Sequence, residues 1–269
     1  MKKHYLLTAI TAISTIVFPA SKVLAQDAAT IEGEASGTTV TYGNASGAYP
    51  IITAIVTQPG TYNGKTYNSW AFLAQDSSGS LEVYGLTNSS TFAVGDAISL
   101  TGVYSPYHQL PEIEYPYSGV TIQSTGNTVP STQVDTVSAL NVTTLPQTLE
   151  GYLIQIDNIT ISSGSSTLSA GETWGTANLT LTITDGTGSM TMYYYPTSVG
   201  EANENLFGKT IPTGPVDITG YDTVYPGTTP EAEFVPIDIT SVPEPNTLAL
   251  CGLGALTALV LRSRKSNKS

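Results

Sequence analysis

Basic residues are scarce in this chain. Of its nine lysines and arginines, only Lys65 and Lys209 lie between positions 26 and 242. The same region holds 20 of the 21 acidic residues, so its formal charge is −18. A nucleic-acid binder needs cations that displace the counterions of the phosphates, so nucleic acid is not expected as a partner.

Cysteine and histidine are also nearly absent. The single cysteine, Cys251, lies in an apolar C-terminal segment, which leaves the region before it without a disulfide, a thiolate metal site or a catalytic cysteine. His108 is the only histidine between positions 26 and 242. One imidazole cannot supply a metal site that needs two histidines, and no Ser-His-Asp set is recognisable around it.

Three features follow one another at the C-terminus. They are the motif Val242-Pro243-Glu244-Pro245, an apolar segment at 246–261, and a basic cluster formed by Arg262, Arg264 and Lys265. As a helix, the apolar segment would rise about 24 Å, slightly less than the ~30 Å hydrocarbon core of a membrane. The basic cluster should stay on the cytoplasmic side and leave everything before Val242 outside.

This order resembles the PEP-CTERM sorting signal of bacterial surface proteins. The resemblance implies that a membrane-embedded exosortase reads the Pro-Glu-Pro motif, cuts there and passes the protein to the cell surface or the extracellular polymer. The protein would then be anchored in the inner membrane only transiently. A plain C-terminal tail anchor is the alternative, and it places the same residues outside.

The N-terminus agrees with export. Residues 1–4 are basic, 5–18 are apolar, and small residues precede Gln26. This pattern predicts a secretory signal peptide at 1–25. A retained N-terminal anchor is the alternative, although Pro19 and Lys22 end the apolar run early.

Short segments rich in β-branched and aromatic residues, separated by Gly, Pro, Asn and Ser, predict an all-β chain. An internal repeat organises these segments. Residues 69–84 align without gaps on 178–193, and each copy predicts a β-hairpin with Asp-x-x-Gly at its turn. Asp76 and Asp185 would accept backbone N–H groups, and Gly79 and Gly188 would take positive φ.

The repeat continues downstream of the hairpins. Residues 97–102 match 215–220, and 111–114 match 230–233. Each copy then gives five strands in the order of an OB-fold, and resembles the OB-like modules of secreted bacterial proteins. A β-sandwich is the alternative, because short strands with turn signals do not fix topology.

The predicted organisation follows from these features. It comprises a signal peptide (1–25), a flexible leader (26–48), a first barrel (49–123), a linker (124–147), a second barrel (148–241) and the sorting segment with its transmembrane helix (242–269).

Aromatic residues cluster in both copies beside carboxylates, a combination that suits neutral sugars. The candidate ligand-binding residues are Tyr104, Tyr107, His108, Tyr115, Tyr117, Tyr193, Tyr194 and Tyr221. The alternative is that tyrosine is simply favoured on exposed strands, and that the single histidine is an ordinary loop residue.

Paired acids recur at aligned positions and are hard oxygen donors suited to calcium. They are Glu112, Glu114, Glu231 and Glu233. No EF-hand loop accompanies them, so the pairs can equally be inherited twice with the module. No other cofactor is expected.

Together these features predict an exported, exosortase-processed surface or extracellular-matrix protein. Its β modules are expected to be non-catalytic and to bind or build exopolysaccharide, because two small modules offer no deep-cleft scaffold. A secreted carboxylate-based hydrolase acting on polysaccharide is the alternative, since acidic residues are plentiful.

Overall fold

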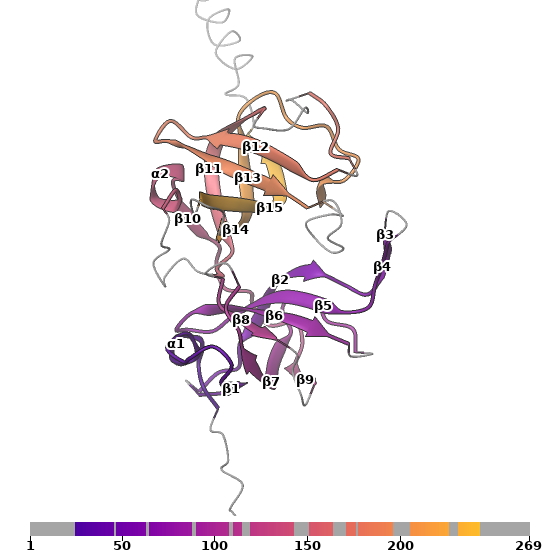
Figure 1. Ribbon diagram of the computed structural model, residues 1–269, viewed down its shortest axis with the longest axis vertical. Coiled ribbons are helices and arrows are strands. Elements are labelled where there is room, and N and C mark those ends of the chain that lie inside the picture. Colours follow the sequence, from indigo (N-terminus) through magenta and orange to yellow (C-terminus); the bar gives the residue numbers. More distant parts are fainter. Residues whose placement is uncertain are drawn as a thin grey trace, which may run out of the picture.

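The computed structural model describes residues 25–45, 47–62, 65–87, 90–107, 110–114, 119–142, 151–163, 171–175, 177–195, 205–225 and 231–242. These residues form two β barrels, with the N-terminal barrel below and the C-terminal barrel above in Figure 1. The predicted signal peptide (except Ala25) and the predicted sorting helix lie outside the described residues. Among the residues described, no helix is long and apolar enough to cross a membrane.

Barrel 1 is a closed ring of strands. It contains α1 (Ala28–Glu32), β1 (Thr39–Tyr42), β2 (Ile51–Thr57), β5 (Trp70–Gln75), β6 (Ser80–Leu86), β7 (Ala97–Tyr104), β8 (Glu112–Glu114) and β9 (Val120–Ser124), and carries a small hairpin of β3 (Gly60–Tyr62) and β4 (Lys65–Tyr67). The ring runs β2-β5-β6-β8-β7 and closes where Ile51 of β2 pairs with Ala97 of β7. Only the β6–β8 contact in the ring is parallel.

Barrel 2 repeats this order. It contains β10 (Gln133–Asp135), α2 (Val137–Leu140), β11 (Ile154–Ser163), β12 (Leu179–Thr184), β13 (Ser189–Tyr194), β14 (Val216–Tyr225) and β15 (Glu231–Ser241). The ring β11-β12-β13-β15-β14 closes through the β11–β14 pair, and β13 and β15 are parallel. Two closed five-strand rings support the predicted OB-like barrels over the alternative sandwich, whose sheets stay open.

Within residues 26–48, which the sequence predicts to be a flexible leader, α1 and β1 form part of barrel 1 instead. β1 pairs with β7, and β7 lies between β1 and β2 in the order of the sheet. The first amides of α1 are held by the hairpin turn: Ala28 N–H donates to Asp76 Oδ2 (2.9 Å), and Ala29 N–H donates to Ser78 Oγ (3.1 Å). These long-range contacts order a segment whose Gly, Ser and Thr content suggests a flexible chain.

Part of the predicted linker, 124–147, likewise belongs to barrel 2, because β10 and α2 lie within it. Val137 N–H, at the start of α2, donates to Asp185 Oδ2 (2.8 Å), and Ser138 N–H donates to Thr187 Oγ1 (3.1 Å). The repeating unit therefore starts earlier than the sequence suggests, with a short helix that docks on its own hairpin turn.

The turn aspartates have the predicted role, but the turn glycines do not. Asp76 Oδ1 accepts the N–H groups of Ser78 (2.7 Å) and Gly79 (3.1 Å). Neither Gly79 nor Gly188 has a positive φ. A Cβ on Gly79 would lie 2.9 Å from the Cβ of Ala28, so this glycine allows the close approach of α1.

Burial differs between the two barrels. β12 alternates between buried and half-buried residues, as expected for a strand with one face in a core. β2 and β5 are buried on both faces. Their outward apolar side chains form a cluster shared with barrel 2, made of Ala54, Val56, Ala71, Leu73, Leu110, Tyr221, Val235 and Ile237. The barrels therefore pack through a common apolar contact.

Candidate functional site

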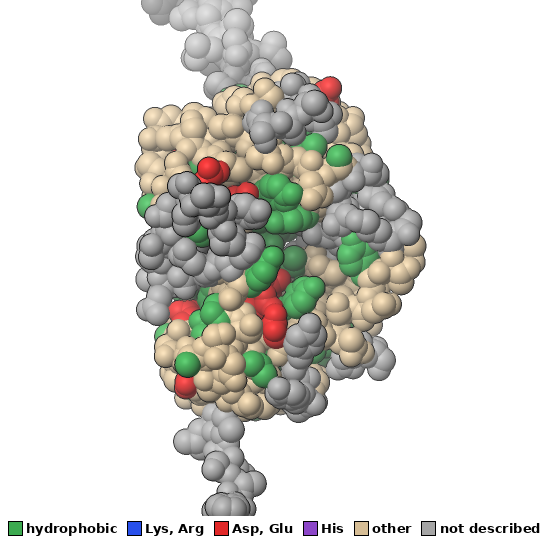
Figure 2. Space-filling view, in the orientation of Figure 1, with side chains coloured by type: hydrophobic (Ala, Val, Ile, Leu, Met, Phe, Trp, Pro, Cys, Tyr) green, Lys and Arg blue, Asp and Glu red, His purple; other side chains and the backbone are tan. Residues whose placement is uncertain are grey.

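A cleft opens beside this shared cluster, where the two barrels meet. Its volume is about 440 Å³. Figure 2 shows apolar and acidic side chains gathered in this hollow. The lining residues are Val56, Thr57, Tyr67, Glu82, Tyr84, Tyr107, Leu110, Glu112 and Glu114 from barrel 1, and Tyr195, Tyr221, Thr223 and Val235 from barrel 2.

Strand alternation aims the acidic side chains at the cleft. On β6, Leu81 and Val83 point into the core of barrel 1, so Glu82 and Tyr84 point outward toward barrel 2. In the parallel β6–β8 pair, Glu82 lies opposite Glu112. Glu82 and Glu112 are only 7% and 4% exposed, so both carboxyl groups are largely removed from bulk water.

This environment favours the protonated carboxyl groups. Burial raises the pKa of Glu82 from 4.5 to about 7. The pKa of Glu112 rises from 4.5 to about 9, through burial first, then through the charges of Glu82 and Glu114 and a side-chain hydrogen bond with Glu114. Among the described residues that line the cleft, none is basic, so no lining side chain offsets the acidic charge.

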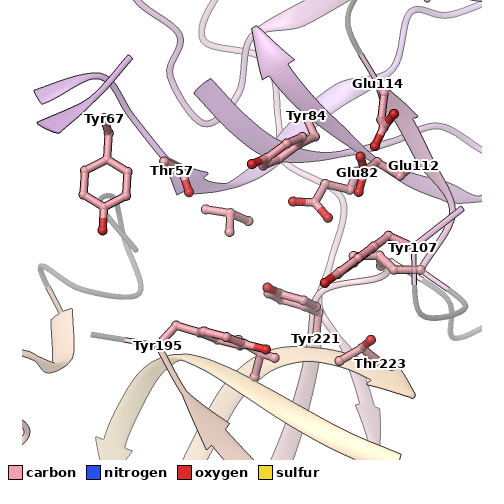
Figure 3. Close-up of a pocket in the computed structure, with 13 residues that line it drawn as sticks. Thr57, Tyr67, Glu82, Tyr84, Tyr107, Glu112, Glu114, Tyr195, Tyr221 and Thr223 are labelled. Atoms are coloured by element: carbon pink, nitrogen blue, oxygen red, sulfur yellow. The ribbon is translucent and has the colours of Figure 1, made fainter. Parts of the chain in front are cut away.

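Tyrosines form the rest of the wall. Figure 3 shows Tyr221 of β14 and Glu82 of β6 directed into the same space from opposite barrels. Burial, followed by the charges of Glu82, Tyr195 and Glu112, raises the pKa of Tyr221 well above 10.0, so its hydroxyl keeps its proton. Tyr84 and Tyr107 are 42% and 57% exposed and offer ring faces to a ligand.

The structure separates the predicted binding residues into groups. Tyr107 and Tyr221 line the cleft, together with Glu112 and Glu114. Tyr104 and Tyr194 lie in the two barrel cores instead, at 6% and 1% exposure. Burial within those cores removes them from a ligand surface.

Other candidates lie outside the cleft. Tyr193 is on the outer face of barrel 2, where its hydroxyl accepts a hydrogen bond from Asn178 Nδ2 (2.8 Å). Three more, His108, Tyr115 and Tyr117, lie outside the described residues.

Sequence reasoning missed Glu82, the most central acid of the site. One signal could have found it. The outward residues of the first hairpin, Ala71 and Leu73, are apolar, whereas the aligned residues of the second copy are Thr180 and Thr182. That difference marks a covered face in the first copy, and Glu82 is the charged residue on it.

The strand pairings of the two barrels match the suggested calcium donors differently from the sequence alignment. Val83 pairs with Ile113, and the aligned Met192 pairs with Phe234. Glu112 therefore corresponds to Glu233, two residues away from its match in the sequence alignment. Within the described ranges, no group of three or more acidic, histidine or cysteine residues is arranged to hold a metal ion.

Barrel 2 leads directly into the C-terminal signal. β15 ends at Ser241, and the model of the PEP-CTERM protein-sorting motif matches residues 241–265. The chain carries a PEP-CTERM sorting motif. This confirms the predicted signal and marks an exported protein that an exosortase sorts. Pro243, Glu244, Pro245 and the basic residues Arg262, Arg264 and Lys265 lie outside the described residues.

Solved structures offer only distant similarities. A murine DNA-binding protein bound to double-stranded DNA is 13% identical, with a TM-score of 0.37 over 78% of this chain and 98% of that chain. The Ifi202 HINa domain in complex with double-stranded DNA is 12% identical, with a TM-score of 0.37 over 77% of this chain and 98% of that chain. No curated protein sequence matches. The fold assignment therefore rests on the strand pairings alone.

Proposed function

We propose that this chain is an exported, exosortase-sorted surface protein that binds extracellular polysaccharide in the cleft between its barrels, without catalysis. One observation carries the proposal: a single cavity lined by five tyrosines and three glutamates drawn from both barrels. Tyrosine rings offer apolar faces on which sugar rings stack, and carboxyl and hydroxyl groups bond to sugar hydroxyls.

The location of the cleft supports the same function. β5 and β6 are the second and third strands of the barrel 1 ring, and their outer face borders the cleft. OB-type barrels bind oligosaccharides and oligonucleotides on this face. Oligonucleotides are disfavoured here, because the region from 26 to 242 has a formal charge of −18 and only two lysines.

A glycan-binding screen tests the proposal. The full chain, purified in detergent, is applied to immobilised neutral and charged polysaccharides, and retention is measured beside Tyr107→Ala. We expect specific retention, with affinity lowered about tenfold by this loss of an exposed ring. Tyr49→Ala is the matched control, because Tyr49 does not line the cleft. Retention that is equal in all three proteins would place binding elsewhere and contradict the proposal.

A carboxylate-based hydrolase is the second candidate, and one observation favours it. Glu82 and Glu112 share the cleft with unequal pKa values of about 7 and about 9. Pairs of carboxyl groups whose pKa values differ serve as acid and base in glycosidases. The same screen separates the candidates, because release of shortened glycans that stops in Glu82→Gln or Glu112→Gln would identify a hydrolase.

A further inference from the structure

Glu82 is a nearly buried acid without a hydrogen-bond partner among the described residues. Its side chain is 7% exposed, and that exposure is toward the cleft. Its carboxyl group accepts no hydrogen bond from any residue that the structure describes, and burial is what raises its pKa. A polar group held in this way costs free energy unless a ligand satisfies it.

A second unsatisfied group lies at the other end of the same cavity. The hydroxyl of Tyr67, on β4, is buried and has no hydrogen-bond partner among the described residues. In Figure 3, Tyr67, Tyr195 and Tyr221 border the space into which Glu82 points. The cavity therefore presents unsatisfied polar groups together with aromatic rings.

Different ligands satisfy such a cavity to different extents. The acids are not arranged for a metal ion within the described residues. A neutral sugar can donate hydroxyl protons to Glu82, but it leaves the acidic charge uncompensated. An ammonium group supplies three hydrogen-bond donors and a positive charge, and it is attracted to tyrosine ring faces.

We propose that the cleft recognises a protonated primary amine, and that the unit it binds in an extracellular polysaccharide is an amino sugar. This inference rests on the proposed function and specifies the ligand. Glu82 of β6 is the primary counter-charge, with Glu112 and Glu114 of β8 beside it and Tyr221 of β14 facing it. An amine seated there forms a charge-assisted hydrogen bond with Glu82.

Binding should also release a proton. Near pH 7, Glu82 is only partly ionised and Glu112 is protonated, given pKa values of about 7 and about 9. At a pH below the pKa of the amine, the ligand arrives already protonated. A bound ammonium then favours the ionised carboxylate, so part of the bound population must lose a proton to the buffer. A neutral sugar does not require this loss.

The test compares two matched probes, an oligomer of β-linked glucosamine and the same oligomer fully N-acetylated. The full chain in detergent is titrated with each by calorimetry, at a pH low enough to keep the amine protonated, in two buffers with different ionisation enthalpies. We expect the glucosamine oligomer to bind about tenfold more tightly, a difference of roughly 1.4 kcal/mol. The dependence of its binding enthalpy on the buffer should report proton release.

Glu82→Gln is the decisive variant, because it keeps the shape of the side chain and removes the charge. It should abolish the preference for the amine and the proton release, so that the two oligomers bind with similar affinity. Glu112→Gln, as a second variant, should reduce the preference. Glu231→Gln is the control, because this exposed glutamate does not line the cleft.

Each outcome decides a claim. Equal binding of both oligomers that is lost in Tyr107→Ala overturns the amine inference and leaves the proposed function standing. Binding of neither oligomer contradicts both for this class of glycan. A preference for the amine that persists in Glu82→Gln and Glu112→Gln and disappears in salt reflects diffuse attraction to a polyanion, and it overturns the inference.

Discussion

Glu82 of β6 lies directly opposite Glu112 of β8, in the parallel strand pair of the barrel 1 ring. Like charges at directly opposed positions destabilise a sheet, and these two groups are nearly buried as well. No described residue lining the cleft carries a compensating positive charge. Burial and mutual repulsion therefore oppose ionisation of both groups, a combination that is frequent in functional sites.

The pair should make stability fall as pH rises. The ordinary pKa of a glutamate is 4.5, whereas folding raises the pKa values to about 7 for Glu82 and about 9 for Glu112. Between about pH 4.5 and pH 9, the folded protein therefore keeps protons that the unfolded chain has lost, and the free energy of unfolding decreases. Urea unfolding at about pH 5, 7 and 9 measures this trend.

Variants identify the source of the trend. Glu82→Gln and Glu112→Gln should raise stability at about pH 9 by a few kcal/mol and leave it nearly unchanged below about pH 4.5. The exposed Glu231→Gln should behave as the wild type does. A wild-type profile that is flat from neutral to alkaline pH would show that the two carboxyl groups are not held in their protonated form.

Asp222 gives a second prediction, inside barrel 2. Equivalent strand pairing places it where barrel 1 has Tyr104: Tyr104 pairs with Ile113, and Asp222 pairs with the corresponding Phe234. Asp222 is fully buried, and its Oδ2 has no hydrogen-bond partner among the described residues. Its pKa rises from 3.8 to about 8 through burial, despite the N–H of Thr223 donated to Oδ1 and with a small contribution from Asp135.

Replacing the Asp222 carboxyl group with an amide should stabilise the protein. Between about pH 4 and pH 8 the unfolded chain ionises this aspartate and the folded protein does not, so the penalty grows with pH. Asp222→Asn should therefore raise the free energy of unfolding by a few kcal/mol at about pH 8, and little at acidic pH. Asp157→Asn, on the exposed part of β11, is the control. Equal stability of Asp222→Asn and wild type at alkaline pH would contradict the prediction.

Alternation and the internal repeat predict the strands and barrels well, because both can be recognised from the order of residues alone. The order Leu179-Thr180-Leu181-Thr182-Ile183 indicates a strand with one buried face, and the structure agrees. α1 and β1 escape such reasoning because distant residues hold them. The amide of Ala28, for example, is bound by Asp76, 48 residues away.

The site was harder to predict for a related reason. Its lining runs from Val56 to Val235 in the sequence and comes from both barrels, so only the packing of the barrels assembles it. Tyrosine clusters alone could not separate Tyr221, which faces the cleft, from Tyr194, which fills a core beside Trp174. The two tyrosines differ in the face of the sheet from which the side chain projects, and strand register determines that face.

The docked helices provide a third prediction. Asp76 uses one oxygen for the turn and the other for the amide of Ala28, and Asp185 does the same for Val137. An asparagine keeps only one acceptor oxygen and must lose one set of bonds. Asp76→Asn should therefore cost ~2 kcal/mol in urea unfolding, and Asp185→Asn less, because it is more exposed.

Acid should weaken the contact between Asp185 and the start of α2. Burial opposes ionisation of Asp185, but the hydrogen bonds it accepts from Thr187, Val137 and Gly188 outweigh burial and hold its pKa below 3.8. The stability it provides is therefore complete above about pH 4 and is lost as pH falls through the lowered pKa. Amide exchange at α2 reports this loss. Exchange at α2 that is the same in Asp185→Asn and wild type would contradict a role of Asp185 in holding this helix.

The last prediction concerns sorting, which the matched segment 241–265 places directly after β15. If an exosortase reads Pro243-Glu244-Pro245, changing these residues to alanine should leave the protein in the inner membrane, because the apolar segment 246–261 and the basic cluster are unchanged. Fractionation of tagged cells should find wild type at the surface or in the extracellular polymer. Alanine at Pro230 and Glu231, a second Pro-Glu pair outside the matched segment, is the control and should sort normally. Wild type and the motif variant held equally in the inner membrane would indicate a plain tail anchor, because an anchor depends on apolar length and flanking charge and does not depend on Pro-Glu-Pro.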